Sequence, residues 1–225
     1  MDKDNLSAYK STQYDEKIVK TLPFYAQFHQ SVIDIVRYCG APTAGRWLDT
    51  GCGTGAVYLA ARESFPEMKF VLADPSDGML DVAKTKIGDS AEFVLGASQE
   101  LDFEEGTFDV ITAIQSHHYL DKDTRRAAVS NCYRMLKPRG LFIVFENILP
   151  MSEFGEEVGL SRWKEFQISG GILPEDAEKH IARHKTECFP ITISEHIELL
   201  NEVGFGCAEV LWASYMQAGF YAVKM

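Results

Sequence analysis

The sequence predicts a doubly wound α/β fold built as a single domain. Short runs of apolar and β-branched residues alternate with longer helical patterns, and the glycine-rich stretch LDTGCGTGAVYLA (48–60) follows the first of these runs. Apolar strands that alternate with amphipathic helices form a parallel sheet covered on both faces. Such sheets bind ligands beyond the carboxyl ends of their strands. With 225 residues, 46% of them hydrophobic, the chain is long enough for one such domain.

The segment before the first predicted strand is expected to form a helical flap. Residues 14–39 carry Phe28, Val32, Ile35 and Val36 at helical spacing, and Pro23 breaks the run.

The middle of the chain is expected to alternate strands with helices. Apolar runs predict strands at RWLDT (46–50), FVLA (70–73), EFVL (92–95), FDVITAI (108–114) and LFIVFE (141–146). Helical spacing predicts helices from Ala56 to Ser64, from Gly78 to Lys86 and from Thr124 to Leu136.

Residues 147–190 fall outside this alternation. Helical stretches here are interrupted by Pro150, by the pair Gly170 and Gly171, and by Pro174 and Pro190. An interrupted pattern of this kind indicates an inserted lid rather than another layer of the sheet.

The chain is expected to end in a helix and two strands. ISEHIELLNEVGF (193–205) predicts a helix with Ser194 as its N-cap and Gly204 at its end, and the tail predicts an antiparallel strand pair at the sheet edge. The single domain, 1–225, therefore divides into a flap, a core, a lid and a C-terminal part, at 1–44, 45–146, 147–190 and 191–225.

Composition narrows the classes of partner. The formal net charge is -11, which repels phosphate backbones and anionic lipid, so a small organic partner is expected and nucleic acid or membrane is not. The five cysteines have no C-x-x-C spacing, so neither disulfides nor a zinc site are expected from them. The two adjacent histidines have no evident third ligand, so they are not expected to bind a metal. A charged N-terminus without an apolar signal core indicates a cytoplasmic protein.

The glycine loop raises the question of its ligand. Gly51, Gly53 and Gly55 lie where a strand meets a helix, and Gly51, Gly53 and Ala56 also satisfy the dinucleotide pattern G-x-G-x-x-G/A. Asp49 would repel a pyrophosphate but attract the ammonium of an amino-acid ligand. Alternatively, Asp49 caps the loop through backbone N–H groups.

A second carboxylate follows the second strand. Asp74 lies 74 − 51 = 23 positions after the first glycine, close to the roughly 20 residues expected of an acid that binds ribose hydroxyls. Alternatively, Asp74 starts a turn before Pro75. An acid for an ammonium and an acid for a ribose together predict a nucleoside that carries an amino acid, which describes S-adenosylmethionine.

Four motifs in order resemble those of the class I S-adenosylmethionine-dependent methyltransferases. They are LDTGCGTG, VLADPSDGML, LGASQELDFEEGTFDVITA and MLKPRGLFIVFE. The resemblance implies a Rossmann-like sheet of seven strands with a reversed last strand. The leader YDEKIVKTLPFY is similar to that of the carboxy-S-adenosylmethionine synthases and of their tRNA wobble-uridine methyltransferase relatives, although the arginine that those synthases use for the extra carboxylate cannot be placed.

The resemblance also implies roles for individual residues. Asp49, Gly51, Cys52 and Gly53 would hold the methionine part of the cofactor, Asp74 the ribose and Met79 the adenine. Ala97 stands where the family often has an acid for the adenine amino group, so the backbone of Ala97 and Ser98 or the side chain of Gln99 would replace it. The remaining candidates for the cofactor pocket are Tyr25, Gln115 and Ser116.

The methyl acceptor is expected at the end of the fourth strand. His117 and His118 are adjacent, so in an extended chain at most one would face the donor, where it could deprotonate or orient the acceptor. Both could instead be structural. Glu146 and Asn147 are expected to face the same crevice. The flap and lid are expected to add aromatic and cationic lining from Tyr14, Tyr25, Phe28, Arg162, Trp163 and Phe166.

We therefore predict an S-adenosylmethionine-dependent methyltransferase that acts on a small molecule by in-line displacement, a reaction that needs alignment more than a base. The alternatives are a tRNA-modifying or carboxy-S-adenosylmethionine-type enzyme, a dinucleotide-dependent oxidoreductase, and a binding protein without catalysis. Neither the acceptor nor the oligomeric state follows from the sequence.

Overall fold

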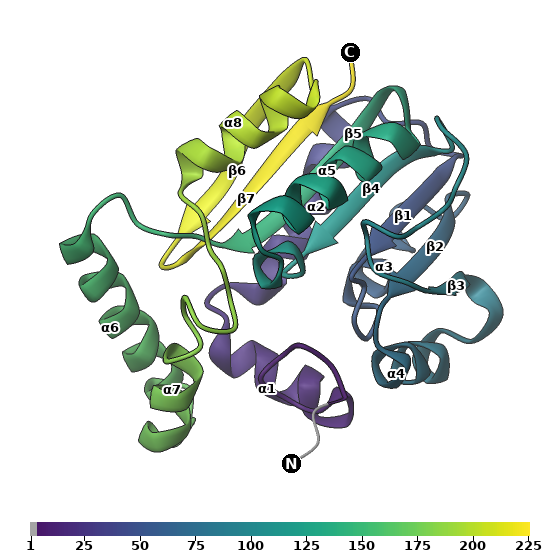
Figure 1. The fold of residues 1–225 in the computed structure, drawn as a ribbon. Coiled ribbons are helices and arrows are strands. Elements are labelled where there is room, and N and C mark those ends of the chain that lie inside the picture. Colours follow the sequence, from purple (N-terminus) through teal and green to yellow (C-terminus); the bar gives the residue numbers. More distant parts are fainter. Residues whose placement is uncertain (1–3) are drawn as a thin grey trace.

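A seven-stranded sheet lies at the centre of the molecule, in the order β3-β2-β1-β4-β5-β7-β6 (Figure 1). The structure is a computed structural model that describes residues 4–225, so residues 1–3 of the predicted flap lie outside it. Strands β1 to β5 pair in parallel, and β7 runs antiparallel to both of its neighbours. The doubly wound fold with a reversed last strand is confirmed.

The strands lie where apolar runs predicted them. Their bounds are Arg46–Thr50 (β1), Lys69–Asp74 (β2), Glu92–Leu95 (β3), Phe108–Ile114 (β4), Leu136–Asn147 (β5), Cys207–Ser214 (β6) and Gln217–Val223 (β7). Strand β5 begins before the predicted start at Leu141, because Leu136 already pairs with Phe108 across an irregularity in the register. The predicted strand pair in the tail does form, and its second member inserts beside β5.

Helices cover both faces of the sheet. In chain order they are Tyr14–Thr21 (α1), Tyr25–Tyr38 (α2), Ala56–Ala61 (α3), Asp77–Ile87 (α4), Lys122–Met135 (α5), Glu153–Ser169 (α6), Pro174–Ile181 (α7) and Ile193–Val203 (α8), with short 3-10 turns at Ser11–Gln13, Gly88–Ser90 and His117–Tyr119. None of the described helices is long and apolar enough to cross a bilayer.

The start of α8 corrects the sequence analysis. Thr192, not Ser194, is the N-cap: its hydroxyl accepts the backbone N–H of Glu195, whose carboxylate in turn accepts the backbone N–H of Thr192. This reciprocal pair is a capping box, which satisfies two helix-terminal donors at once. Gly204 ends the helix with a φ of 116°, as predicted.

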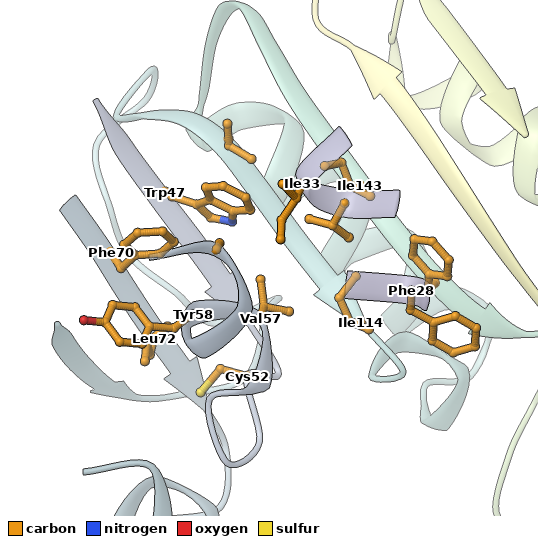
Figure 2. Packing of buried hydrophobic residues seen from close by; sticks show 14 of the residues in the cluster. Phe28, Ile33, Trp47, Cys52, Val57, Tyr58, Phe70, Leu72, Ile114 and Ile143 are labelled. Atoms are coloured by element: carbon orange, nitrogen blue, oxygen red, sulfur yellow. The ribbon is translucent and has the colours of Figure 1, made fainter. Parts of the chain in front are cut away.

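Two hydrophobic cores hold the sheet between its helices. One core joins the sheet to α2 and α3, and Trp47 lies in it beside Phe70 (Figure 2). The other joins the opposite face to α5 and α8 through residues such as Phe142 and Leu200. All five cysteines are free thiols, as predicted from their spacing.

The flap and lid helices gather beyond the carboxyl ends of the strands. Figure 1 shows α1, α6 and α7 together at this end of the sheet. Pro23 separates α1 from α2, and the indole N–H of Trp163 in α6 donates to the carbonyl of Thr21 at 2.7 Å. This contact ties the lid to the flap at the edge where the fold binds ligands.

Candidate functional site

The glycine loop after β1 makes a tight turn. Gly51, Gly53 and Gly55 all have positive φ, a conformation that other residues adopt only with strain. A Cβ on Gly51 would lie 2.4 Å from the Cβ of Ser116, whereas the space beside Gly53 is open. The loop therefore needs glycine at Gly51 for packing, and at Gly53 it presents bare backbone to a ligand.

Asp49 is buried at the end of β1 with one oxygen unpartnered. Its side chain is 1% exposed, and Oδ1 accepts the hydroxyl of Thr112 at 2.7 Å, but Oδ2 has no hydrogen-bond partner. Burial raises the pKa of Asp49 to about 7, against the opposing effect of the Thr112 hydrogen bond. The proposed cap on the loop is not observed, since no described backbone N–H donates to this carboxylate.

Asp74 at the end of β2 holds the loop and a turn together. Its carboxylate accepts the N–H of Gly53 at 2.8 Å and the N–H of Ser76 at 2.9 Å. Burial raises its pKa, while the two backbone hydrogen bonds oppose the shift. The turn-forming role is therefore observed, and each carboxylate oxygen still has a lone pair for a further donor.

A cavity of about 450 Å³, hereafter the main cavity, lies over these two acids. Every predicted cofactor-binding residue except those of the loop 97–99 lines it: Tyr25, Asp49, Gly51, Cys52, Gly53, Asp74, Met79 and Gln115, together with Ser116. The volume falls within the roughly 300–1,000 Å³ of pockets for small organic ligands. Its lining includes Asp4, Asp49 and Asp74, and none of the described residues that line it is Lys or Arg, so the cavity is acidic.

Ala97 and Ser98 lie outside the lining of the main cavity. The Ser98 hydroxyl is hydrogen-bonded to Thr50 Oγ1 at 2.8 Å and to His117 Nε2 at 2.9 Å. Gln99 Oε1 is buried and has no partner, so it is the free acceptor of this loop. The cofactor role of Ala97 and Ser98 stays a prediction.

Part of the lining of the main cavity comes from residues that the sequence analysis missed. Asp4, Asn5, Leu6 and Ser7 form an N-terminal segment across the cavity, and His29 and Tyr119 also line it. The Ser76 hydroxyl donates to the carbonyl of Asp4 at 2.7 Å, and the Arg183 guanidinium donates to that of Leu6 at 2.6 Å. The segment thus joins the core to the lid.

The two adjacent histidines do not lie in an extended chain, which corrects the geometry expected of them. His117 and His118 occupy a 3-10 turn after β4, both are buried, and neither lines the main cavity. His117 contacts Ser98, and burial lowers its pKa to about 4, so it is neutral at physiological pH. The catalytic role given to both stays a prediction.

His118 forms a buried pair with Glu146. Its Nδ1 lies 2.9 Å from Glu146 Oε2, and the other carboxylate oxygen accepts the backbone N–H of His117 at 3.0 Å. Burial opposes the charge on His118, but hydrogen bonds to Cys188 and Glu146 raise its pKa to about 9. Glu146 therefore does not face the crevice as expected; it lies beneath the turn and balances this imidazole.

A second cavity of about 30 Å³ adjoins the main cavity. Ser7, Tyr14, Gln115 and Tyr119 line both cavities. The residues that line only the second cavity include His118, Asn147, Trp163, His180, Arg183 and Cys188. The second cavity is therefore richer in imidazole and guanidinium groups than the acidic main cavity.

Several residues predicted to line the acceptor site lie elsewhere. Phe28 is fully buried against Phe145, and Arg162 and Phe166 contact Tyr215 instead of a cavity. Tyr14, Tyr25, Trp163 and Asn147 do reach the cavities.

Comparison with known proteins agrees with this geometry. Residues 48–140 match a model of the methyltransferase domain. The carboxy-S-adenosyl-L-methionine synthase of Wolinella succinogenes is 25% identical over 94% of this chain and 89% of its own, and the demethylmenaquinone methyltransferase of Thermotoga maritima is 26% identical over 70% and 69%.

A solved structure supports the fold. A methyltransferase from Thermotoga maritima, described as S-adenosylmethionine-dependent and as a possible histamine N-methyltransferase, superposes with a TM-score of 0.67 over 95% of this chain and 96% of that one, at 18% identity. The domain match, the two relatives and the seven-stranded sheet with its reversed strand lead to one assignment. Residues 48–140 thus match a methyltransferase domain, and this match, the relatives and the fold support a class I S-adenosylmethionine-dependent methyltransferase.

Proposed function

We propose that the main cavity binds S-adenosylmethionine and that the enzyme transfers its methyl group to a small organic acceptor at the border with the second cavity. The observation that carries this proposal is Gln115, a buried side chain that lines both cavities and whose Nε2 has no hydrogen-bond partner. Its backbone has a φ of 56°, in the left-handed region, where non-glycine residues concentrate at functional sites.

The residues of the main cavity fit the donor. Asp49 Oδ2 is a buried carboxylate oxygen without a partner, which suits the ammonium of the methionine part. Open space at Gly53 lets the ligand approach the backbone, and Asp74 has lone pairs for ribose hydroxyls. The bound sulfonium supplies an activated methyl group with its own leaving group, so this chain has to orient the acceptor and exclude water.

The acceptor would meet Gln115 and the tyrosines shared by the two cavities. An amide N–H that lacks a partner inside a protein gains from an oxygen acceptor, so Gln115 is suited to hold an acceptor that presents oxygen. Of the two adjacent histidines, His118 borders the second cavity, where its positive charge can orient a polar acceptor. His117 contacts Ser98 and lines neither the main cavity nor the second cavity.

The experiment is incubation of a metabolite extract with the enzyme and isotope-labelled donor, followed by mass spectrometry for products that gain one methyl. We expect such a product with the native enzyme. With Gln115→Leu we expect acceptor turnover to fall by roughly 10- to 100-fold, as loss of one buried hydrogen bond predicts, and donor affinity to change less than roughly twofold. No methylated product from any extract, or unchanged turnover in the variant, would argue against the proposal.

A second candidate is a carboxy-S-adenosylmethionine-type enzyme. The similarity to the Wolinella succinogenes synthase over nearly the whole chain supports it. An added carboxylate on the donor would need a cation, and none of the described lining residues of the main cavity is Lys or Arg; Arg183 lies at the second cavity and donates to the carbonyl of Leu6. A donor that gains a carboxyl group in the same mass-spectrometric assay would select this candidate.

A further inference from the structure

Cys188 stands next to a buried imidazole–carboxylate pair that the methyl-transfer proposal does not use as a unit. Cys188 and His118 both line the small second cavity, and the Nδ1 of His118 lies 2.9 Å from Glu146 Oε2. Glu146 is fully buried and His118 nearly so. A thiol on an imidazole that a carboxylate orients is the arrangement by which proteins activate a nucleophile.

Backbone contacts fix this arrangement. The N–H of Phe189 donates to the carbonyl of His118 at 2.7 Å. Arg125 joins the same two segments, because its guanidinium donates to the carbonyls of both His117 and Phe189. The segment that carries Cys188 is therefore held against the histidine turn.

The thiol also faces a space for a ligand. Cys188 lines the second cavity together with Gln115, whose buried Nε2 lacks a partner. The second cavity shares lining residues with the larger main cavity, which gives a small molecule a route to the thiol.

We infer that Cys188 is the nucleophile of a Cys188–His118–Glu146 triad and that small carbon electrophiles alkylate it in the second cavity. In this reaction the sulfur forms a bond to the electrophilic carbon, the halide or other leaving group departs with the electrons of the broken bond, and the thiol proton is released to water, while the positive charge of His118, which Glu146 balances, stabilises the thiolate. The adduct fills the second cavity and blocks the acceptor, a consequence that rests on the proposed function.

Cys52 provides a matched comparison within the same molecule. It is 7% exposed and lines the main cavity, while Cys188 is 6% exposed and lines the second cavity. Burial raises the pKa of the Cys52 thiol well above its usual range, and the negative charges of Asp49 and Asp74 raise it further. Two thiols of equal exposure thus differ in whether an imidazole or carboxylates lie beside them.

The test is the rate of alkylation of each cysteine by iodoacetamide, measured by peptide mass spectrometry on the 225-residue protein without donor or acceptor. We expect Cys188 to react at least roughly tenfold faster than Cys52, and Glu146→Gln to slow Cys188 by a similar factor. A Cys188 rate equal to or below that of Cys52 would overturn the inference.

Loss of fold in the variant is detected in the same experiment. Cys132 is fully buried in the core, so its alkylation reports unfolding. If Glu146→Gln exposes Cys132, the comparison of Cys188 with Cys52 in the native protein still decides the question. Because no methyl transfer is measured, failure here is separate from failure of the proposed function.

Discussion

At the scale of single residues, two neighbouring acids of the main cavity differ in what they already bind. Asp74 accepts two backbone N–H groups, whereas Asp49 keeps one buried oxygen without a partner. A buried carboxylate without full hydrogen bonding is costly, and burial accordingly raises the pKa of Asp49 to about 7. This cost is expected where a cationic ligand completes the site.

Replacement of Asp74 tests its contact with the ligand. We predict that Asp74→Ala weakens S-adenosylmethionine binding by roughly 1–3 kcal/mol, because charge-assisted hydrogen bonds to the ribose are lost. Titration calorimetry measures the change. Asp77→Ala is the control, since Asp77 is exposed on the same turn and lies outside the cavity lining; equal effects of the two variants would leave Asp74 as a turn residue only.

Asp49 predicts a pH dependence of donor binding. The pKa of its folded-state carboxyl is raised to about 7, so the free protein takes up a proton there as the pH falls below 7. Ammonium binding requires the ionised form, so the affinity should fall with pH, by up to about tenfold per unit well below pH 7.

The control for this pH dependence is Asp49→Asn. The variant keeps the shape but cannot ionise, so the ratio of native to variant affinity cancels titration of the ligand and of other groups. We expect this ratio to decrease from pH 8 to pH 6 in calorimetric titrations. A constant ratio would mean that Asp49 does not contact the ammonium.

At the scale of secondary structure, helix ends show what a local pattern can and cannot decide. Ser194 and Thr192 are both hydroxyl residues ahead of the same apolar run, and the sequence analysis chose the wrong one. The partner decides between them: only Thr192 has Glu195 three residues later, which completes the capping box.

Substitutions at this helix end should reproduce the difference. Thr192→Ala is expected to lower the free energy of unfolding by about 1 kcal/mol, because a helix-terminal N–H loses its acceptor. Ser194→Ala, at an exposed position inside the helix, should change it by less than about 0.5 kcal/mol. Urea unfolding of both variants measures the two values, and equal losses would contradict the assignment of the cap.

The turn after β4 could not be predicted from its own residues. AIQSHHYL has apolar residues on both sides of the histidines, which permits an extended chain. The turn instead depends on Glu146, which accepts the N–H of His117 and pairs with His118 from the neighbouring strand. Because these contacts join residues far apart in the sequence, a local pattern contains no sign of them.

At the scale of the whole molecule, the sheet was predictable, and so were the glycine loop and the two acids that line the main cavity. Apolar strands must be buried, so β1 follows from a local rule. Glycines at a strand-to-helix turn permit positive φ, so the loop at Gly51 and Gly53 follows from a second local rule. The acids at the strand ends then lie at the main cavity. Family resemblance supplied the number of strands and the reversed last strand, which is β7.

The N-terminal segment that lines part of the main cavity was not predictable. The segment from Asp4 to Ser7 is polar apart from Leu6 and has no periodicity. Its place is set by hydrogen bonds from Ser76 and Arg183, which lie far along the chain. Ala97 and Ser98 were expected at the cavity because of the family motif, but the Ser98 hydroxyl is directed to Thr50 and His117. Such placements depend on tertiary contacts.

Titration calorimetry with S-adenosylmethionine and, separately, with NADH tests most directly whether the main cavity binds an adenosyl amino acid. The acids Asp49 and Asp74 attract an ammonium and repel a pyrophosphate. We predict that S-adenosylmethionine binds with a Kd of about 10 µM or tighter and that NADH gives no binding heat. Binding of NADH, or no heat from S-adenosylmethionine at roughly 1 mM, would contradict the assignment.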